Sequence, residues 1–244
     1  LLDQYGNATT DTVDHAMAFS SPLTGSHLSS SSCTIVAGQA SCGVQVTSTV
    51  AGSDAITALD TATGGVAQPV SNGSPATVTF TPGAAAKLAI TSAPVTVGVE
   101  TCTAMTVEMQ DAHGNTTHPS SAVTLVPTSS SGGATFYGDS GCSTALTSLT
   151  NPSIGATGST SVTFYWEDTV SGTPQILVTP ATGSLTADQQ QETVTAGGPS
   201  DGAQGTRLSL SSSTVVADGV SSTTLTATLL DRYGNATTDT VDHA

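Results

Sequence analysis

Side chains that could carry out chemistry are few and scattered along this chain of 244 residues. The sequence holds five histidines and four cysteines, and its 18 acidic residues face only 3 basic ones. Zinc sites use closely spaced cysteines and histidines, such as C-x-x-C pairs, and the sequence contains no such pair. We therefore predict no zinc centre and no cofactor, and we assign no metal-ligating residue.

One short segment has the residue types of a nucleophilic site. Residues 138–141 read G-D-S-G, as around the nucleophile of some serine proteases. A nucleophilic serine needs a histidine base and a carboxylate within reach. The nearest histidines, His113 and His118, fall in a predicted turn. We therefore assign no catalytic residue and predict that the protein is not an enzyme.

A D-x-x-G-N motif occurs three times. We predict a turn in which a strand ends at the aspartate, the glycine adopts a positive φ, and the asparagine side chain hydrogen-bonds the backbone of its own loop. A calcium site built from Asp3, Asn7, Asp11 and Asp14 is the alternative, although the dense D-x-D-x-D-G spacing of an EF-hand is absent. The motif residues are Asp3, Gly6, Asn7, Asp111, Gly114, Asn115, Asp231, Gly234 and Asn235.

The two ends of the chain repeat each other. Residues 1–16 and 229–244 differ at one of 16 positions, Gln4 against Arg232. The segments that lead into Asp111 and Asp231 also correspond, because apolar residues coincide at every second position. We interpret the sequence as one 228-residue period of a longer tandem array, followed by the 16-residue overlap. The alternative to a continuous polypeptide is a set of separate subunits, in which residues 206–228 of one subunit add strands to the first domain of its neighbour.

The spacing of the motifs and the strand pattern define the fold class. The three aspartates lie 108 and 120 residues apart, the size of one immunoglobulin-like domain. We predict an all-β protein of tandem immunoglobulin-like Greek-key β-sandwiches. The domains are expected at 1–84 (lacking its first strands), 85–200 (complete) and 206–244 (the first strands of the next repeat). The strands expected in the middle domain are Lys87–Thr91, Val95–Val99, Thr103–Gln110, Ala122–Pro127, Ala134–Tyr137, Ser161–Glu167, Gln175–Thr179 and Glu192–Thr195.

Several of these segments resemble a known family. Residues 2–7 (LDQYGN), and residues 216–219 (VADG) and 224–227 (TLTA) before the other copy, are similar to bacterial Ig-like domains of the invasin/intimin type. Residues 44–58 resemble the closing strands of such domains, and 134–142 with 161–166 resemble a divergent repeat. The resemblance implies a large secreted, cell-surface or fibre-forming protein.

The cysteines indicate where such a protein would reside. Four cysteines allow three pairings, and the domain division selects Cys33–Cys42, across a hairpin near Gly38, and Cys102–Cys142. Buried free thiols are the alternative. Disulfides form in oxidising compartments, so we expect an extracellular or cell-surface protein.

Charge limits the partners. Charged residues make up 9% of the chain and the net charge is −15, so no surface can neutralise a run of phosphates. No apolar run approaches the ~20 residues of a membrane span. We therefore expect neither nucleic-acid binding nor membrane insertion. The N-x-S/T sequons at Asn7, Asn72, Asn115 and Asn235 leave glycosylation open.

The function expected from these features is structural. Repeats without a catalytic constellation supply length and stiffness. We expect a unit of an extracellular fibre or cell-surface stalk, whose partners are neighbouring Ig-like repeats of the same or identical chains. The alternative is an adhesin module that binds a glycan or receptor through its loops, although aromatic residues are only 4% of the chain.

Overall fold

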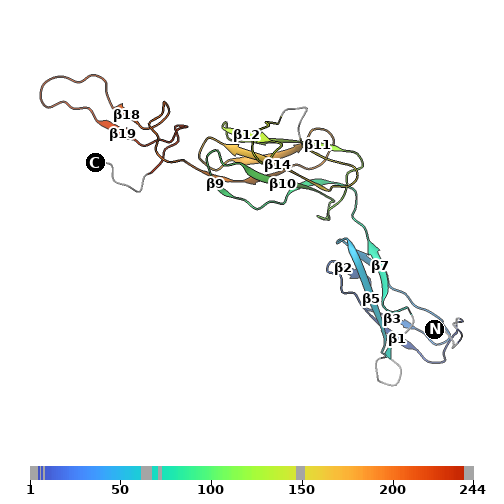
Figure 1. Cartoon of the computed structure of the whole chain (residues 1–244). Coiled ribbons are helices and arrows are strands. Elements are labelled where there is room, and N and C mark those ends of the chain that lie inside the picture. The colour runs from blue at the N-terminus through green and yellow to red at the C-terminus, as the bar shows by residue number, and fades with distance from the viewer. Residues whose placement is uncertain are drawn as a thin grey trace. The chain divides into compact units, whose positions relative to one another are not determined.

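The computed structural model describes Tyr5, Asn7 and residues 9–61, 68–70, 73–146 and 152–238 (Figure 1). Every regular element in these residues is a β-strand, as expected from the alternating apolar pattern. A search of the same residues finds no helix of the length and apolar character that a membrane crossing requires. The chain divides into two compact units, Leu1–Gly83 with Asp111–Thr117, and Ala84–Gln110 with His118–Ala244.

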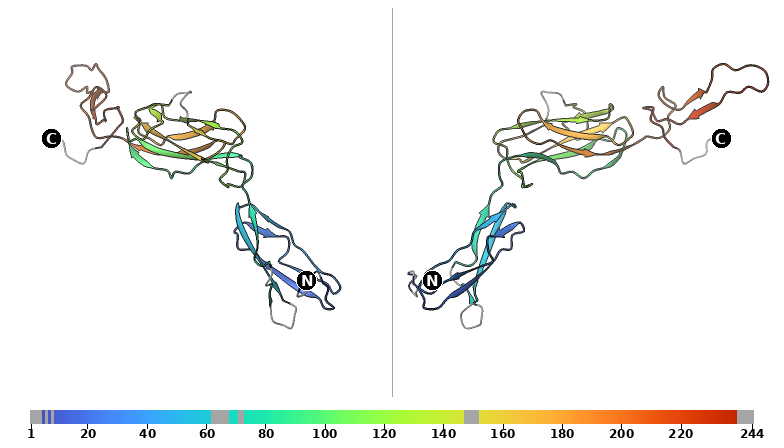
Figure 2. Two further views of the ribbon diagram at one scale, coloured as in Figure 1. Left: turned by 45° about the vertical axis from the view of Figure 1, so that its right-hand side comes forward. Right: turned by 180° about the vertical axis from the view of Figure 1, so that it is seen from behind.

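The second unit contains a sandwich of two four-stranded antiparallel sheets (Figure 2). One sheet has the order β12-β14-β10-β8, and the other has the order β13-β11-β15-β16. The first two strands of the domain pair with different partners. β8 pairs antiparallel with β10, and β9 pairs in parallel with β17. The strands are β8 (Lys87–Ile90), β9 (Thr96–Gly98), β10 (Thr103–Gln110), β11 (Val123–Ser129), β12 (Ala134–Tyr137), β13 (Ser153–Ile154), β14 (Ser161–Asp168), β15 (Gln175–Pro180), β16 (Asp188–Gln191) and β17 (Thr193–Thr195).

Alternation along the strands builds the core of this sandwich. Phe164 and Trp166 are buried on β14, and Val162, which alternation places on the same face, is half-buried. Phe136 meets Phe164 edge to face, with ring centroids 5.9 Å apart. Eleven buried hydrophobic side chains, from both four-stranded sheets and from β17, form one cluster: Leu88, Met105, Val107, Met109, Leu125, Ile154, Phe164, Trp166, Ile176, Val178 and Val194.

The predicted strands agree closely with those of the second unit. Thr103–Gln110 and Ala134–Tyr137 have the predicted bounds. The sequence analysis missed β13 and β16. The first is two residues long, and β16 reads D-Q-Q-Q, which carries no apolar alternation. It is held instead by pairing with β15 and by the Asp188 carboxylate, which accepts a hydrogen bond from the Ile90 N–H at 2.7 Å.

The first unit has fewer strands and a thinner core. Its larger sheet has the order β3-β1-β5-β6, with β7 also paired to β5, and β2 pairs with β4. Among the described residues of this unit, Ile35 is the one buried hydrophobic side chain. The strands are β1 (His15–Ser20), β2 (Ser26–Leu28), β3 (Ser32–Ile35), β4 (Val46–Ser48), β5 (Gly52–Asp60), β6 (Gln68–Pro69) and β7 (Ala76–Phe80).

Both expected disulfides are present. Cys33 bonds to Cys42 and Cys102 bonds to Cys142, with Cα atoms 6.0 and 5.8 Å apart. The predicted hairpin between Cys33 and Cys42 is wrong, because β3 pairs with β1 and the chain after Cys42 enters β4, which pairs with β2. Gly38 does lie in a turn, with φ of 81°. The first disulfide therefore joins β3 to the irregular segment that precedes β4.

A two-stranded hairpin follows the sandwich of the second unit. It consists of β18 (Arg207–Leu210) and β19 (Leu225–Thr228), which pair antiparallel. The hairpin leads into the third copy of the D-x-x-G-N motif.

Candidate functional site: the D-x-x-G-N turns

Each described D-x-x-G-N segment is a closed turn organised by its aspartate. In the copy that starts at Asp111, the backbone N–H of Asp111 donates to the Asn115 carbonyl at 2.9 Å. One carboxylate oxygen of Asp111 accepts the backbone N–H groups of His113 and Asn115, both at 2.9 Å. Gly114 has a φ of 90°, a conformation that glycine adopts without a Cβ clash.

The second described copy has the same geometry. Asp231 Oδ1 accepts the N–H groups of Tyr233 and Asn235, both at 2.9 Å, and Gly234 has a φ of 87°. Of the first copy, Asp3 and Gly6 lie outside the described residues. The aspartate, and not the asparagine as predicted, therefore binds the backbone of its own loop.

The asparagine side chain reaches out of its turn. Asn115 Oδ1 accepts the N–H of Ala51 at 2.8 Å, and its Nδ2 donates to the Thr49 carbonyl at 3.0 Å. The same Nδ2 donates to Asp111 Oδ2 at 2.8 Å, which holds the amide plane in place. A single asparagine side chain thus satisfies a donor and an acceptor on another segment, 64 and 66 residues earlier in the chain.

Asn235 makes the corresponding contacts in the second unit. Its Oδ1 accepts the Ser171 N–H at 2.9 Å, and its Nδ2 donates to the Thr169 carbonyl and to Asp231 Oδ2, both at 2.8 Å. The acceptor segments read T-V-A-G (49–52) and T-V-S-G (169–172). We call the asparagine and its acceptor loop the Asn latch.

A second contact ties each turn to the chain before its repeat. Asp111 Oδ2 accepts the Gly83 N–H at 2.8 Å, and Asp231 Oδ2 accepts the Gly197 N–H at 3.0 Å. The threonine two residues after each asparagine donates its hydroxyl back to the carbonyl of that glycine, at 3.0 Å from Thr117 and 2.6 Å from Thr237. The turn, the Asn latch and the segment at Gly83 or Gly197 therefore form one hydrogen-bonded assembly, and the described residues contain it twice.

The aspartates of the turns are held as carboxylates. The Asn115 amide, together with backbone N–H groups, places the pKa of Asp111 well below its usual range. Burial raises the pKa of Asp231, but hydrogen bonds from the Asn235 side chain and from backbone N–H groups outweigh it, and the pKa is lowered. Both oxygens of each buried carboxylate are engaged by N–H donors. A cation at either carboxylate would displace bonds that hold the turn.

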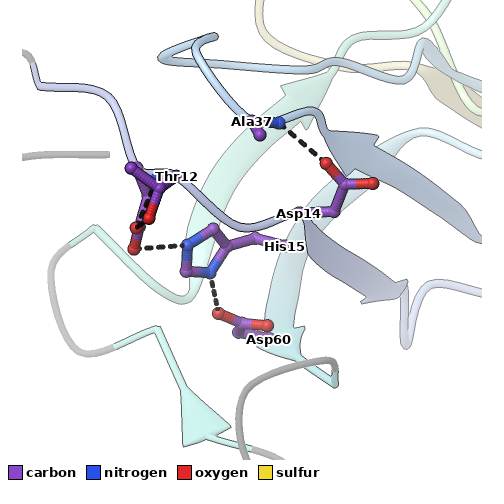
Figure 3. Close-up of polar contacts among 6 residues, drawn as sticks. Thr12, Asp14, His15, Ala37 and Asp60 are labelled. Carbon is purple, nitrogen blue, oxygen red and sulfur yellow. Dashed lines mark hydrogen bonds and ion pairs between the residues drawn. The ribbon is translucent and has the colours of Figure 1, made fainter.

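The calcium alternative involved residues next to the first motif copy. Figure 3 shows that Asp14 accepts the Ala37 N–H, at 2.7 Å, and that Asp60 binds the His15 ring, at 2.6 Å. Asp11 contacts the other ring nitrogen of His15 at 3.1 Å. Asp11 and Asp14 thus have separate partners, and Asp3 lies outside the described residues. Among the residues that the structure describes, no group of three or more His, Cys, Asp or Glu side chains is arranged to hold a metal ion.

The G-D-S-G segment is a turn capped by its aspartate. Asp139 accepts backbone N–H groups from Gly141, Ser143 and Thr144, and the donors at Thr144 and Ser143 lower its pKa to about 2. The turn positions Cys142 for its bond to Cys102.

The sequence analysis identified the turns but missed their acceptors. A signal was present, since T-V-A-G and T-V-S-G lie 120 residues apart, as do Asp111 and Asp231. The one residue that differs between the 16-residue copies, Arg232 in place of Gln4, forms an ion pair with Glu100. Its side chain is 62% exposed, so this ion pair adds little stability.

The protein is thus an all-β chain with immunoglobulin-like domains. No protein-family model matches the chain, and a sequence comparison with curated proteins found no match. Among solved structures, it is similar to domains 4–9 of the surface layer protein SbsC, with 19% identity over 98% of this chain and 31% of that chain, at a TM-score of 0.33. It therefore spans about a third of that structure.

Two bacterial surface proteins are also similar. Invasin, a bacterial integrin-binding protein, matches at 17% identity over 97% of this chain and 42% of its own, with a TM-score of 0.36. The Escherichia coli adhesin FdeC matches at 21% identity over 95% of this chain and 67% of its own, with a TM-score of 0.38. These are proteins of the kind that the sequence resembles. The function proposed below rests on the chain's own residues.

Proposed function

We propose that this chain is a structural repeat unit of an extracellular fibre or cell-surface stalk built from tandem Ig-like domains. The observation that carries the proposal is the Asn latch, which occurs with the same contacts at Asn115 and at Asn235. A contact that recurs at every repeat is what a linear array needs, because each repeat binds only its neighbours.

The cysteines support a location outside the cell. All four cysteines form disulfides, and none is free. Such bonds persist in oxidising compartments and are rare in the cytosol. The scarcity of lysine and arginine also suits exposure to trypsin-like proteases, since only 3 such residues occur in 244.

Imaging of native material tests the proposal. An antibody raised against the 244-residue chain, applied with gold label to negatively stained cells and culture medium, is expected to mark fibres or stalks at regular intervals. Regular spacing distinguishes a repeated unit from a single domain at a tip. Label confined to the cell interior, or to one point at the end of each stalk, would count against the proposal.

Binding measurements separate the adhesin alternative. The isolated chain is expected to show no saturable binding to a glycan array or to host-cell surfaces. Saturable binding that survives substitution of both Asn115 and Asn235 would identify a loop-borne adhesin in place of a structural repeat.

A further inference from the structure

The asparagine of each Asn latch is also the first residue of an N-x-T sequon. The two sequons are N-T-T at 115–117 and N-A-T at 235–237. In a sequon, a glycosyltransferase attaches a sugar to the side-chain nitrogen of the asparagine, Nδ2. The contacts of that nitrogen therefore decide whether the folded chain can accept a sugar there. The sequons at Asn7 and Asn72 include residues outside the part of the chain that the structure describes.

Both hydrogens of the Asn235 side-chain nitrogen are in use. A side-chain amide nitrogen carries two hydrogens. One is donated to the Thr169 carbonyl and the other to the Asp231 carboxylate, each over an N···O distance of 2.8 Å. Attachment of a sugar replaces one of these hydrogens by a carbon atom. The modified nitrogen can therefore serve only one of its two acceptors.

The space around this nitrogen is closed to a sugar as well. The Asn235 side chain belongs to a residue that is only 9% exposed. A carbon bonded to Nδ2 at about 1.46 Å, in the direction of either acceptor, would lie about 1.3 Å from the acceptor oxygen. Such a separation is close to the length of a covalent bond. A sugar can therefore be accommodated only after the acceptor loop and the turn have moved apart.

The hydroxyl group of the same sequon has a structural partner too. Thr237 Oγ1 donates to the Gly197 carbonyl at 2.6 Å. A hydroxyl residue at this third position is what makes the segment an acceptor for N-glycosylation. In the folded chain the asparagine thus binds the acceptor loop, and the threonine binds the segment before the repeat.

The sequon at Asn115 repeats this arrangement in the first unit. Asn115 is half-buried, and its Nδ2 donates to the Thr49 carbonyl at 3.0 Å and to Asp111 Oδ2 at 2.8 Å. Thr117 Oγ1 donates to the Gly83 carbonyl at 3.0 Å. The two residue types that define a sequon therefore have the same structural partners in both described copies.

We propose that Asn115 and Asn235 are latch-gated glycosylation sites, at which an N-linked sugar and the Asn latch compete for the same nitrogen. While the latch is formed, neither asparagine accepts a sugar. A sugar attached before the latch forms keeps the latch open, and it releases the turn from its acceptor loop. The competition involves only the atoms of the latch, so it can be tested whether or not the chain builds a fibre.

A soluble N-glucosyltransferase with UDP-glucose is a suitable probe, because it adds a single sugar to an N-x-S/T sequon. In this transfer the bond between C1 of glucose and the phosphate oxygen of UDP breaks, and C1 forms a bond to Nδ2. UDP leaves with the electron pair of the broken bond, and the nitrogen loses one proton. The lost hydrogen is one of the two that the latch uses.

The rate of transfer to the folded, full-length chain tests the gating. Site-resolved mass spectrometry is expected to show that Asn235 is modified at least tenfold more slowly than the same sequon in a synthetic peptide of residues 229–240. Equal rates for the folded chain and the peptide would overturn the proposal.

Removal of one aspartate opens one latch and leaves its sequon intact. Asp231→Ala is expected to accelerate modification of Asn235 at least tenfold, while Asn115 in the same chain remains slow. Asp111→Ala is expected to give the reverse pattern. Trp166 fluorescence reports that the second unit remains folded in each variant. Acceleration at both asparagines, or at neither, would show that the latch does not control access, and it would overturn the proposal.

The reverse effect, of the sugar on the latch, is tested on chains modified before they fold. Co-expression with the transferase exposes the sequons to it during synthesis. In the purified species with one glucose on Asn235, hydrogen exchange at the Ser171 N–H is expected to be at least tenfold faster than in the unmodified chain. The species with one glucose on Asn115 is the matched control, and its exchange at Ser171 should be unchanged.

An unchanged exchange rate at Ser171 in the species modified at Asn235 would overturn the proposal. Regular labelling of native fibres, measured as above, does not depend on that result. Failure of the gating and failure of the structural role are therefore distinguishable.

Discussion

Replacement of Asn235 by alanine tests whether the latch holds the turn to the sandwich. The side chain is 9% exposed and makes three hydrogen bonds, to Ser171, Thr169 and Asp231. A buried donor or acceptor left without a partner costs about 1–3 kcal/mol. Taking about 2 kcal/mol for the Ser171 N–H alone, and about 1.4 kcal/mol per factor of ten, local opening becomes about 30-fold more frequent.

Amide hydrogen exchange measures this opening at the affected group. Exchange at the Ser171 N–H, followed by NMR in the full chain, is expected to accelerate about 30-fold in Asn235→Ala. The first unit provides a matched control, because Asn115→Ala should accelerate exchange at the Ala51 N–H and leave Ser171 unchanged. If Ser171 exchanges at its original rate in folded Asn235→Ala, the amide contact does not hold the loop, and the latch is wrong.

Substitution of Asn235 by aspartate distinguishes the contribution of the amide donor from that of the amide oxygen. Asn235→Asp keeps an oxygen for the Ser171 N–H, but it loses the donor to the Thr169 carbonyl and places a second carboxylate against Asp231. The protection factor of Ser171, which is the intrinsic exchange rate of the amide at a given pH divided by the observed rate, is expected to be low at neutral pH and to rise at acidic pH, where one of the two carboxyl groups holds a proton. A protection factor that does not change with pH would show that the two carboxyl groups do not interact.

Three further outcomes are expected. Hydrogen bonds to Asp60 and then to Asp11 raise the pKa of His15. The stability that the protonated His15 contributes is therefore complete below its unfolded pKa of about 6.5 and is lost as pH rises through its folded pKa. Calorimetry should show the first unit losing thermal stability with rising pH, and His15→Gln should flatten that trend. Removing the Cys102–Cys142 bond, which spans 40 residues, should cost about 4 kcal/mol in urea unfolding followed by tryptophan fluorescence, and a loss below about 1 kcal/mol would refute the chain-entropy account. Phe164→Ala, at a fully buried position, should cost about 3–5 kcal/mol in the same assay, against less than about 0.5 kcal/mol for an exposed substitution such as Gln189→Ala.

The sequence was sufficient to predict most of the complete sandwich. Alternation of apolar residues located β10, β12 and β14, because one face of each strand must be buried. The same reasoning failed for β16, whose D-Q-Q-Q sequence is held by pairing with β15 and by polar side chains. A strand that is stabilised mainly by pairing with its neighbours needs no alternation of apolar and polar residues, so its sequence does not predict it.

The turns show a different limit. The glycine and aspartate of each motif act within five consecutive residues, so their conformation is readable from local sequence. The asparagine acts on a loop 64–66 residues away, and it binds backbone atoms there. Backbone acceptors impose little on residue type, so the partner loop could be recognised only by its recurrence at the same spacing.

This use of backbone atoms has a consequence for how the gene can change. The asparagine of the latch binds backbone atoms of its acceptor loop, so the loop residue that donates its N–H can be alanine or serine, as at Ala51 and Ser171. A repeat that contains such a loop can therefore be followed by any repeat that contains the turn at the same spacing. Unequal recombination could delete, duplicate or reorder whole repeats without a compensating substitution at the new boundary. The 16-residue copies at 1–16 and 229–244 have the near-identity that such exchange requires and maintains.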